Sequence, residues 1–407
     1  MKKKILFSLV AFLIVCAAVE AISHAALYFL AAFKGIYVPG SISFRINDKF
    51  RKNIRRILEA DPKKEYVTFD PELGWTLNPN AKAINAEGIC IGETNSLGAR
   101  NAREYPRKKP AGKLRIAAFG DSFTHGSQMP TAFTWQAILE EHDPRLEVLN
   151  FGVEGYGLDQ AYLRYLKDGV GCSPDIVLIC YMSENLARHV NVFRGFYTGT
   201  PYVKPRFLLD EKGELKLLPC PIRKRSDFKK LLDYSFLEEI GRNDFWSGLA
   251  HRPRPLERLA FFRLLRFFGG RKISGRPVTA DERAAPLYVP TKNYMVYDTR
   301  SEAYRVTLKI IEKFYKEVES HGAVPVVVFL PDRQDIEAYL QWGERRYAPL
   351  LEELRKKEYS LTDSMGMLER ATQEYGLYEV TQSHYKPNGN RALAIQIYKY
   401  LHDSGLV

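Results

Sequence analysis

Residues 114–126, LRIAAFGDSFTHG, decide the fold of this chain of 407 residues. Leu114–Phe119 is a short, uninterrupted apolar run, which is typical of a strand buried in a sheet. Directly after it, Gly120 and Gly126 flank a turn that contains Ser122. A buried strand that runs straight into such a turn predicts a parallel sheet with the Ser122 hydroxyl at its carboxyl edge, where open α/β sheets bind their ligands.

Three further apolar runs follow, at residues 146–151, 175–181 and 323–330. Helical patterns separate or follow them, at residues 133–141, 158–167, 302–320 and 390–402. In the third of these patterns, apolar residues recur at four-residue intervals and therefore share one helix face. Strands that alternate with helices predict an α/β fold, a doubly wound parallel sheet covered by helices on both faces.

Residues suited to catalysis stand after three of the predicted strands and before the last helix. The second strand leads into a glycine-rich stretch that contains Gly155, whose backbone N–H can donate to a developing oxyanion. The third strand leads into Asn185, and His384 lies just before the last predicted helix. Each segment alone would fit an ordinary βα turn, so their joint occurrence carries the argument.

In this order, the four segments resemble the SGNH (GDSL) hydrolases, whose flavodoxin-like fold carries serine, glycine, asparagine and histidine on four loops at the sheet edge. Residues 95–100 and the Thr134-Trp135 pair resemble the membrane-anchored bacterial branch, which is related to carbohydrate O-acetylesterases and acetyltransferases. The resemblance covers residues 70–191 and 292–401 and leaves the stretch between them uncovered.

The resemblance implies a role for each matching residue. Ser122 would be the nucleophile, and His384 would be the general base that takes its proton. The backbone N–H groups of Ser122 and Gly155, with the Asn185 amide, would bind the oxyanion. Asp121 would tie down the turn without a catalytic role. No metal and no cofactor are expected.

Two departures from the family pattern concern the histidine and the asparagine. The family has aspartate three or two residues before its histidine, where this chain has Thr381 and Gln382. An orienting carboxylate stabilises the imidazolium, so its loss is costly. The candidates that could replace it are Glu379, Asp332, Asp363 and a backbone carbonyl. The third segment reads Ser183-Glu184-Asn185 instead of Gly-x-Asn-Asp, which leaves Asn191 as a distant alternative to Asn185.

Four other polar residues receive structural interpretations. His125 is expected in a loop that lines the pocket, and His189 is expected to support the third loop. Asp332 and Asp335 are expected to begin a helix rather than to bind a metal.

The N-terminus combines a basic start with a long apolar stretch. Lys2, Lys3 and Lys4 precede an apolar run that continues to residue 33, with Glu20 and His24 among its few polar interruptions. This run is long enough to cross a bilayer, which takes about 20 residues. The lysines are expected to stay on the cytoplasmic side. The sequence therefore predicts a single-pass protein of the inner membrane with a periplasmic catalytic domain.

The alternative to an anchor is a cleaved signal peptide. Val19-Glu20-Ala21 is an acceptable cleavage site, but the apolar run exceeds an ordinary signal, which favours the anchor. Lipid attachment at Cys16 is disfavoured by the bulky Val15 before it. The four cysteines beyond the anchor could form disulfides after export, in any of three pairings.

The formal charge of +12 is concentrated in two places. The first 34 residues carry +3 and residues 194–292 carry +10, so the remainder is close to neutral. We therefore expect a signal anchor (1–34), a lead-in segment (35–112), a core in two parts (113–193 and 293–407) and a basic insertion or cap (194–292). Nucleic-acid binding is not expected, because no recognition motif is present and the compartment is wrong.

Within the insertion, residues 255–268 are aromatic and basic. We expect a cap that packs its apolar face over the active-site edge, with an interfacial helix on anionic lipid as the alternative.

Together these features predict an exported, membrane-tethered serine esterase acting on O-acyl groups, first of all acetyl esters of envelope or extracellular carbohydrate. An O-acetyltransferase with the same acyl-enzyme is an alternative. A catalytically silent scaffold that binds polysaccharide is another, favoured by the missing aspartate and opposed by the presence of Ser122 and His384. Lipid-acyl hydrolysis becomes relevant if the basic insertion touches the membrane. The sequence does not predict an oligomeric state.

Overall fold

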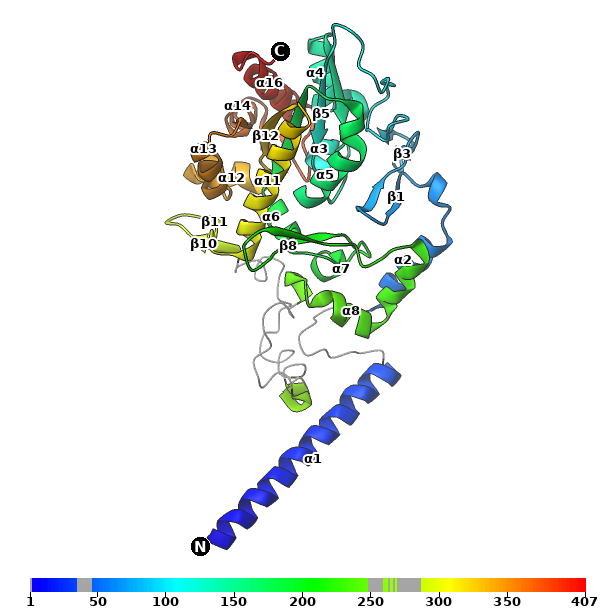
Figure 1. The fold of residues 1–407 in the computed structure, drawn as a ribbon, viewed down its shortest axis with the longest axis vertical. Helices are drawn as coiled ribbons and strands as arrows, with labels where there is room; N and C mark the ends of the chain where they lie inside the picture. The colour runs from blue at the N-terminus through cyan, green and yellow to red at the C-terminus, as the bar shows by residue number, and fades with distance from the viewer. Residues whose placement is uncertain (1, 35–45, 248–258, 263, 266–267, 269–286) are drawn as a thin grey trace. The chain divides into compact units, whose positions relative to one another are not determined.

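The computed structural model describes residues 2–34, 46–247, 259–262, 264–265, 268 and 287–407 (Figure 1). The chain divides into two compact units. The larger unit contains residues 60–190, 204–220 and 284–407, and the smaller unit contains residues 1–59, 191–203 and 221–283. The predicted domain boundaries stay predictions, although residues 204–220 of the predicted insertion cluster with the larger unit.

A five-stranded parallel sheet forms the centre of the larger unit. Its strands are β5 (Leu114–Phe119), β6 (Leu146–Asn150), β7 (Ile176–Met182), β12 (Val324–Leu330) and β13 (Leu361–Asp363). The spatial order is β6-β5-β7-β12-β13, so by chain order the strands lie 2-1-3-4-5, as in flavodoxin-like folds. The predicted α/β class with a parallel sheet is confirmed. The order reverses between β5 and β7, where such sheets place their ligands.

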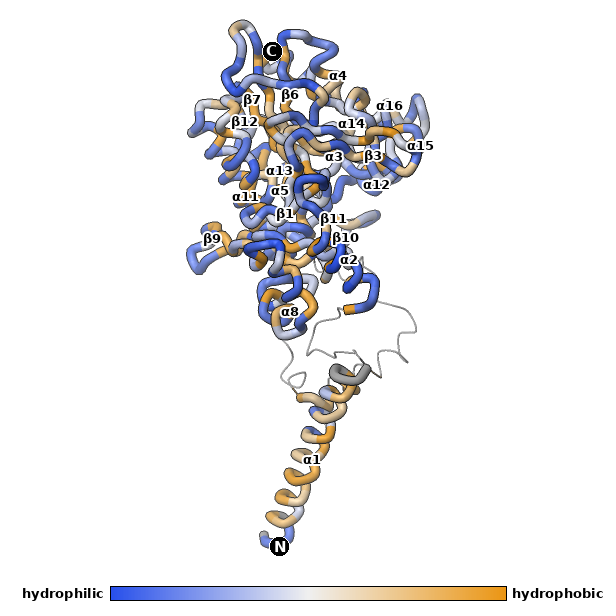
Figure 2. Tube along the Cα trace, turned by 90° about the vertical axis from the view of Figure 1, so that its right-hand side faces the viewer, coloured by the Kyte–Doolittle hydropathy of each residue, from blue (hydrophilic) through white to orange (hydrophobic). Residues whose placement is uncertain are grey.

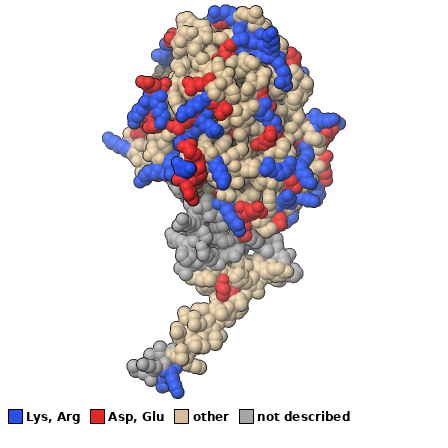
Figure 3. Space-filling view, viewed as in Figure 1, with Lys and Arg blue, Asp and Glu red and all other residues tan. Residues whose placement is uncertain are grey.

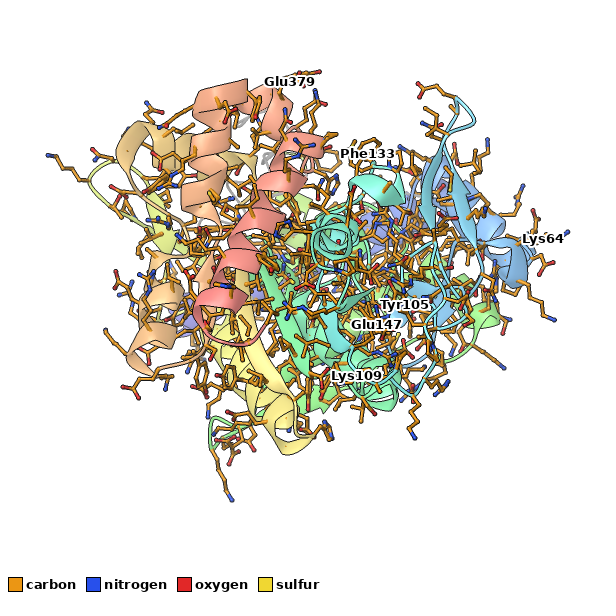
Figure 4. The ribbon with its side chains drawn as sticks, turned by 90° about the horizontal axis from the view of Figure 1, so that it is seen from above. Lys64, Tyr105, Lys109, Phe133, Glu147 and Glu379 are labelled. Carbon is orange, nitrogen blue, oxygen red and sulfur yellow. The ribbon has the colours of Figure 1, made fainter. Side chains whose placement is uncertain are left out.

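The helices of the larger unit cover both faces of this sheet. They are α3 (Ser122–His125), α4 (Trp135–His142), α5 (Leu158–Arg164), α6 (Asn185–Arg188), α11 (Glu302–Ser320), α12 (Arg333–Trp342), α13 (Ala348–Lys356), α14 (Met365–Tyr375), α15 (Leu377–Val380) and α16 (Pro387–Asp403). Helices α4, α14 and α16 pack together, as do α5 and α11. In Figure 4, the red α16 and the yellow α11 lie on opposite sides of the strands.

The periodic helix forms where its pattern predicts it. Helix α11 buries Val306, Ile310, Phe314 and Val318, each fully inaccessible to solvent. Helix α5 is shorter than predicted, because the chain becomes π-helical from residue 165 to residue 169.

Aromatic side chains fix the end of β5. The Phe119 ring stacks on Phe151 at 5.0 Å and meets Tyr165 and Phe314 edge-on at 5.4 and 6.2 Å. All four rings are fully buried. Figure 2 shows the corresponding hydrophobic colour along the central strands. The turn that carries Ser122 therefore starts from a rigid strand.

Besides the central sheet, the larger unit contains antiparallel two-stranded hairpins. They pair β1 (Val67–Asp70) with β2 (Gly74–Leu77), β3 (Lys82–Ile84) with β4 (Cys90–Glu93), β8 (Arg206–Leu209) with β9 (Leu215–Leu218), and β10 (Tyr288–Pro290) with β11 (Met295–Tyr297). Trp75 of β2 packs against Tyr156 and donates its indole N–H to the Glu154 carbonyl at 2.9 Å. The lead-in segment thus supports the loop that follows β6.

The smaller unit contains α1 (Lys2–Lys34), α2 (Asp48–Glu59), α7 (Arg194–Tyr197) and α8 (Tyr234–Gly241). Within it, the Asp244 carboxylate accepts the N–H groups of Val192 and Phe193 and the Asn191 amide, at 2.6, 2.8 and 3.0 Å. The Phe50 ring meets Phe193 edge-on at 5.9 Å.

Helix α1 contains one stretch, Leu6–Leu30, that is long and apolar enough to cross a membrane, a property that a signal sequence shares. Of the predicted helix 255–268, residues 255–258, 263 and 266–267 lie outside the described residues. All five cysteines are free thiols, so none of the three disulfide pairings is formed.

Candidate active site

Ser122 lies at the carboxyl end of β5, as the first residue of α3. The Asp121 side chain caps this short helix by accepting the Phe123 N–H at 2.9 Å. A β-carbon on Gly120 would collide with Thr124 and Cys180, so the turn requires glycine there. The backbone N–H of Ser122 has no acceptor among the described residues, as expected for the first residue of a helix.

Asp121 also fixes the third loop. Its second carboxylate oxygen accepts the Asn185 amide at 2.8 Å and the Arg188 guanidinium at 3.2 Å. Arg188 in turn binds Glu184 and the Tyr156 carbonyl, both at 2.7 Å. Burial raises the pKa of Asp121, and the Arg188 charge opposes this shift. A side-chain amide has two N–H groups, so Asn185 keeps one for another acceptor.

Gly155 lies in the loop after β6 with a φ of 75°, in the left-handed region that favours glycine. Its backbone N–H has no acceptor among the residues that the structure describes. Gly152, in the same loop, lies so close to the backbone of Thr124 and His125 that a β-carbon would not fit. The loop therefore lies directly against the turn of Ser122.

His384 lies in the loop before α16, and its ring centroid is 5.2 Å from that of Phe123, the neighbour of Ser122. Within the described part of the chain, no hydrogen bond joins the His384 ring to Ser122. Burial lowers the pKa of His384, while the carboxylates of Glu154 and Asp121 oppose this shift. This shift favours the neutral imidazole, which can accept a proton.

The His384 Nδ1 atom is buried and has no hydrogen-bond partner in the described structure. The family has aspartate at positions that this chain fills with Thr381 and Gln382. Here the Thr381 hydroxyl and the Gln382 backbone N–H donate to the His384 carbonyl, at 3.3 and 3.1 Å. No backbone carbonyl among the described residues accepts from Nδ1 either.

The three carboxylates considered as replacements are engaged elsewhere. Asp332 pairs with Arg346 at 2.5 Å, and Asp363 pairs with Arg345 at 2.9 Å. Burial, together with the neighbouring Asp335, raises the pKa of Asp332 to about 6. Glu379 is exposed, lies at the rim in Figure 4, and is 3.5 Å from the Lys386 ammonium.

Asp332 and Asp335 begin a helix, as the sequence suggests. Asp332 caps α12 by accepting the Asp335 N–H at 2.9 Å. Asp335 is fully buried and accepts the Ser183 hydroxyl at 2.5 Å. The pair therefore holds the start of the third loop. Among the described residues, no group of three or more His, Cys, Asp or Glu is arranged to hold a metal ion.

Two further histidines, His125 and His189, are buried structural groups. His125 belongs to helix α3 rather than to a loop, and its Nε2 is 2.8 Å from the Tyr66 hydroxyl. Burial lowers its pKa well below the usual value. His189 accepts the Leu158 N–H at 3.0 Å and is 2.6 Å from the Thr307 hydroxyl, so it connects α5 with α11. Burial lowers its pKa to about 3.

Arg100 is the important residue that sequence reasoning missed. Its buried guanidinium donates to the carbonyls of His125, Gly126, Met129 and Ile91. It thereby holds the backbone directly after α3. The only signal in the sequence is its place at the end of the Asn-Ser-Leu-Gly-Ala-Arg turn, residues 95–100.

No family model and no curated protein match this chain. Three of the solved structures it is similar to are a protein from Desulfitobacterium hafniense described as lipolytic and of the G-D-S-L family, an α/β hydrolase from the metagenome of Lake Arreo, and an acetyl xylan esterase from Geobacillus stearothermophilus.

They are 14%, 15% and 12% identical to it, with TM-scores of 0.33, 0.35 and 0.36. They cover 71%, 73% and 71% of this chain, which in turn covers 100%, 97% and 95% of theirs. TM-scores below 0.5 do not establish a common fold, so the functional conclusion depends on the site itself.

Proposed function

We propose that this protein is a serine esterase of the SGNH type, exported and tethered to the inner membrane by its N-terminal helix. One observation carries the proposal: the loops of Ser122, Gly155, Asn185 and His384 meet at the carboxyl edge of one parallel sheet. Asp121 links the first loop to the third, Gly152 brings the second against the first, and Phe123 contacts His384.

In the proposed mechanism, the Ser122 hydroxyl oxygen attacks the ester carbonyl carbon and its proton passes to His384. The oxyanion accepts hydrogen bonds from the N–H groups of Ser122 and Gly155 and from the Asn185 amide. The tetrahedral intermediate then expels the alcohol, which takes the proton from His384. A water molecule, deprotonated by the same imidazole, attacks the carbonyl carbon of the acyl-serine. The Ser122 oxygen leaves and takes the proton back from His384, which releases the carboxylic acid and restores the free enzyme.

Because no carboxylate among the described residues bonds to the His384 ring, the proposed catalytic unit is a dyad. A carboxylate would hold the imidazole in one tautomer and stabilise the imidazolium. Here the fixing contacts are the Phe123 ring and the hydrogen bonds to the His384 carbonyl. Such a dyad is expected to be slower than a triad, but a pKa below the usual value keeps the base in its active form at neutral pH.

The proposed substrates are O-acyl, first of all O-acetyl, esters of envelope or extracellular carbohydrate. This choice follows from the resemblance to the membrane-anchored branch of the SGNH family. The apolar helix α1 supports the tether. A periplasmic reporter fused after Val407 is expected to be active, and activity of a cytoplasmic reporter there would contradict the proposed topology.

The activity test uses the full-length protein in detergent with p-nitrophenyl acetate, longer-chain p-nitrophenyl esters and acetylated oligosaccharides. Ser122→Ala is expected to abolish turnover. Ser404→Ala, which removes an exposed hydroxyl at the end of α16, is the matched control and keeps full activity. Turnover that survives in Ser122→Ala would refute the proposed nucleophile.

A catalytically silent scaffold is the second candidate, because the buried His384 Nδ1 lacks a partner in the described structure. It predicts that folded protein hydrolyses none of these esters but binds acetylated oligosaccharide equally well with and without the Ser122 hydroxyl. Calorimetric titration of both forms distinguishes the two candidates.

A further inference from the structure

Helix α2 has one apolar face and one densely basic face. Phe50 and Ile54 are buried, and the Phe50 ring meets Phe193 edge-on at 5.9 Å. The exposed cations of the helix are Lys49, Arg51, Lys52, Arg55 and Arg56. The two carboxylates of α2 lie at its ends, Asp48 and Glu59. Because positions three and four apart share a helix face, this spacing sets the five cations on the side away from Phe50 and Ile54.

The charges on this face are not neutralised within the described part of the chain. None of the five cations has a side-chain partner there. Even Asp48 and Lys52, which have the four-residue spacing of a helical ion pair, do not form one. Arg51 with Arg55, and Lys52 with Arg56, are like charges at the same spacing, which destabilises a helix. The face therefore carries a repulsion that an anionic partner relieves.

A second basic segment packs beside α2 in the smaller unit. It contains the 3₁₀ helix η5 (Arg225–Leu232), whose Arg225 Nε atom donates to the Ile57 carbonyl of α2 at 2.5 Å. Phe228 and Leu231 of η5 are buried. The exposed cations of this segment that have no side-chain partner among the described residues are Arg223, Lys224 and Lys229. We call these three and the five cations of α2 the basic surface.

The basic surface differs from the rest of the exterior in its charge balance. Residues 48–59 and 223–233 together contain ten basic and four acidic side chains. In the upper part of Figure 3, where the larger unit lies, acidic and basic side chains are interspersed, as is usual for a surface that faces water. An excess of one sign on two adjacent helices instead favours a partner of the opposite sign.

The chain keeps the basic surface near the end of α1. Only residues 35–47 separate Lys34, the last residue of α1, from Asp48, the first residue of α2. At most about 3.5 Å per residue, this length holds the start of α2 within about 50 Å of the end of α1. A surface tethered in this way meets lipid headgroups at a high effective concentration, whereas a soluble polyanion has to be captured from solution. Clusters of Lys and Arg that follow a membrane helix closely are typical of binding to anionic lipid.

We propose that the basic surface docks on the headgroups of anionic phospholipids, in the membrane that α1 is proposed to span. The proposal rests on the anchor proposed above and adds a second, electrostatic contact to it. Each Lys or Arg near an anionic surface strengthens binding by about fivefold, so the loss of three cations weakens docking by about 100-fold. Because the attraction is electrostatic, it requires anionic lipid and weakens as the salt concentration rises.

Docking is tested on full-length protein in nanodiscs of phosphatidylcholine, with or without phosphatidylglycerol. A fluorophore on Ser226→Cys, an exposed position in η5, reports contact with added phosphatidylcholine that carries a nitroxide on its headgroup and quenches only at short range. Cys16 and Cys90 are replaced by serine, and the other cysteines are buried. Strong quenching is expected only with phosphatidylglycerol. It should be lost between about 0.1 M and about 1 M NaCl, as the Debye length falls from about 10 to about 3 Å.

Three sets of substitutions show which cations act. Lys49→Gln, Lys52→Gln and Arg55→Gln together should reduce quenching to its level in neutral discs. Lys49→Arg with Arg55→Lys keeps the charge and should keep the quenching. The matched control replaces by glutamine three exposed cations of the larger unit that have no partner among the described residues, and it should also keep the quenching: Lys108, Lys356 and Lys399. Urea unfolding of each variant confirms that it is folded.

The outcomes separate this inference from the anchor. Protein that enters the discs but is quenched equally with and without phosphatidylglycerol, or equally in the triple glutamine variant of α2, would overturn the inference and leave the anchor intact. Protein that enters no disc would overturn both. Polygalacturonate that binds the protein in neutral discs, with quenching independent of lipid charge, would assign the basic surface to acidic polysaccharide instead. None of these readouts depends on esterase activity.

Discussion

Replacing Asn185 by alanine is expected to lower both kcat and the free energy of unfolding, and a matched control distinguishes the two effects. The Asn185 amide donates to the buried Asp121 carboxylate at 2.8 Å, and its remaining N–H is the proposed oxyanion donor. Loss of one such donor typically lowers kcat by about 10²–10³-fold, equivalent to about 3–4 kcal/mol. Loss of a hydrogen bond to a charged group lowers the free energy of unfolding by about 1.5–3 kcal/mol. KM is expected to change little, because the donor acts mainly in the transition state.

Asn191→Ala is the matched control. The buried Asn191 amide donates to Asp244 at 3.0 Å and to the Phe193 carbonyl at 2.9 Å, within the smaller unit. Its replacement should lower the free energy of unfolding by a similar amount, without the fall in kcat. The measurements are steady-state hydrolysis of p-nitrophenyl acetate and urea unfolding of both variants. Equal loss of kcat in both, or a kcat of Asn185→Ala close to that of the wild type, would refute the assignment of Asn185.

A double-mutant cycle extends this test to Asp121. If the carboxylate acts by holding the Asn185 amide, Asp121→Ala lowers kcat in the wild type but hardly at all in Asn185→Ala. A full additional loss in the double variant would show that Asp121 acts on the reaction by another route.

Three further predictions concern the base His384, the backbone that follows α3, and a buried ion pair in the core. Because burial lowers the pKa of His384, the acid limb of the pH profile of kcat/KM should lie below pH 6.5. In Thr381→Asp, the new carboxylate should raise the pKa of His384 by about one to three units and shift this limb to higher pH. An unshifted limb would show that residue 381 does not reach the imidazole. Arg100→Met leaves four carbonyls without their donor, so it should lower the free energy of unfolding by at least about 3 kcal/mol and also lower kcat. An unchanged midpoint of urea unfolding would contradict this prediction. Lys204→Met leaves the buried Asp159 carboxylate unpaired and should cost about 3–5 kcal/mol in the same assay, whereas a loss below about 1 kcal/mol would mean that the ion pair is not maintained in solution.

The sequence predicts those parts of the fold that depend on local pattern. The runs at β5, β6, β7 and β12 are apolar enough to be recognised as buried strands, and the structure confirms each within one residue. Strand β13 escapes notice because it has three residues, of which only Thr362 is buried. Such an edge strand is defined by its pairing with β12, which no local pattern contains.

For the site, the chain order at the sheet edge locates the four loops, because parallel strands bring their carboxyl ends together. The contacts that fix those loops join residues far apart in the chain, such as Arg100 with the carbonyls after α3 and Asp121 with Asn185. Nothing near these residues in the sequence indicates their partners. The lack of a partner for the His384 Nδ1 atom in the described structure is the opposite case, because Thr381 and Gln382, which replace the family's aspartate, already indicate it.

The central claim is that Ser122 forms an acyl-enzyme with His384 as its base, and covalent trapping tests it most directly. Full-length protein treated with a fluorophosphonate and measured by mass spectrometry should gain one phosphonyl group, located on Ser122. The label should be absent from Ser122→Ala and strongly slowed in His384→Ala, while Ser404→Ala reacts like the wild type. A folded wild-type protein that stays unlabelled, or a label on another residue, would contradict the account.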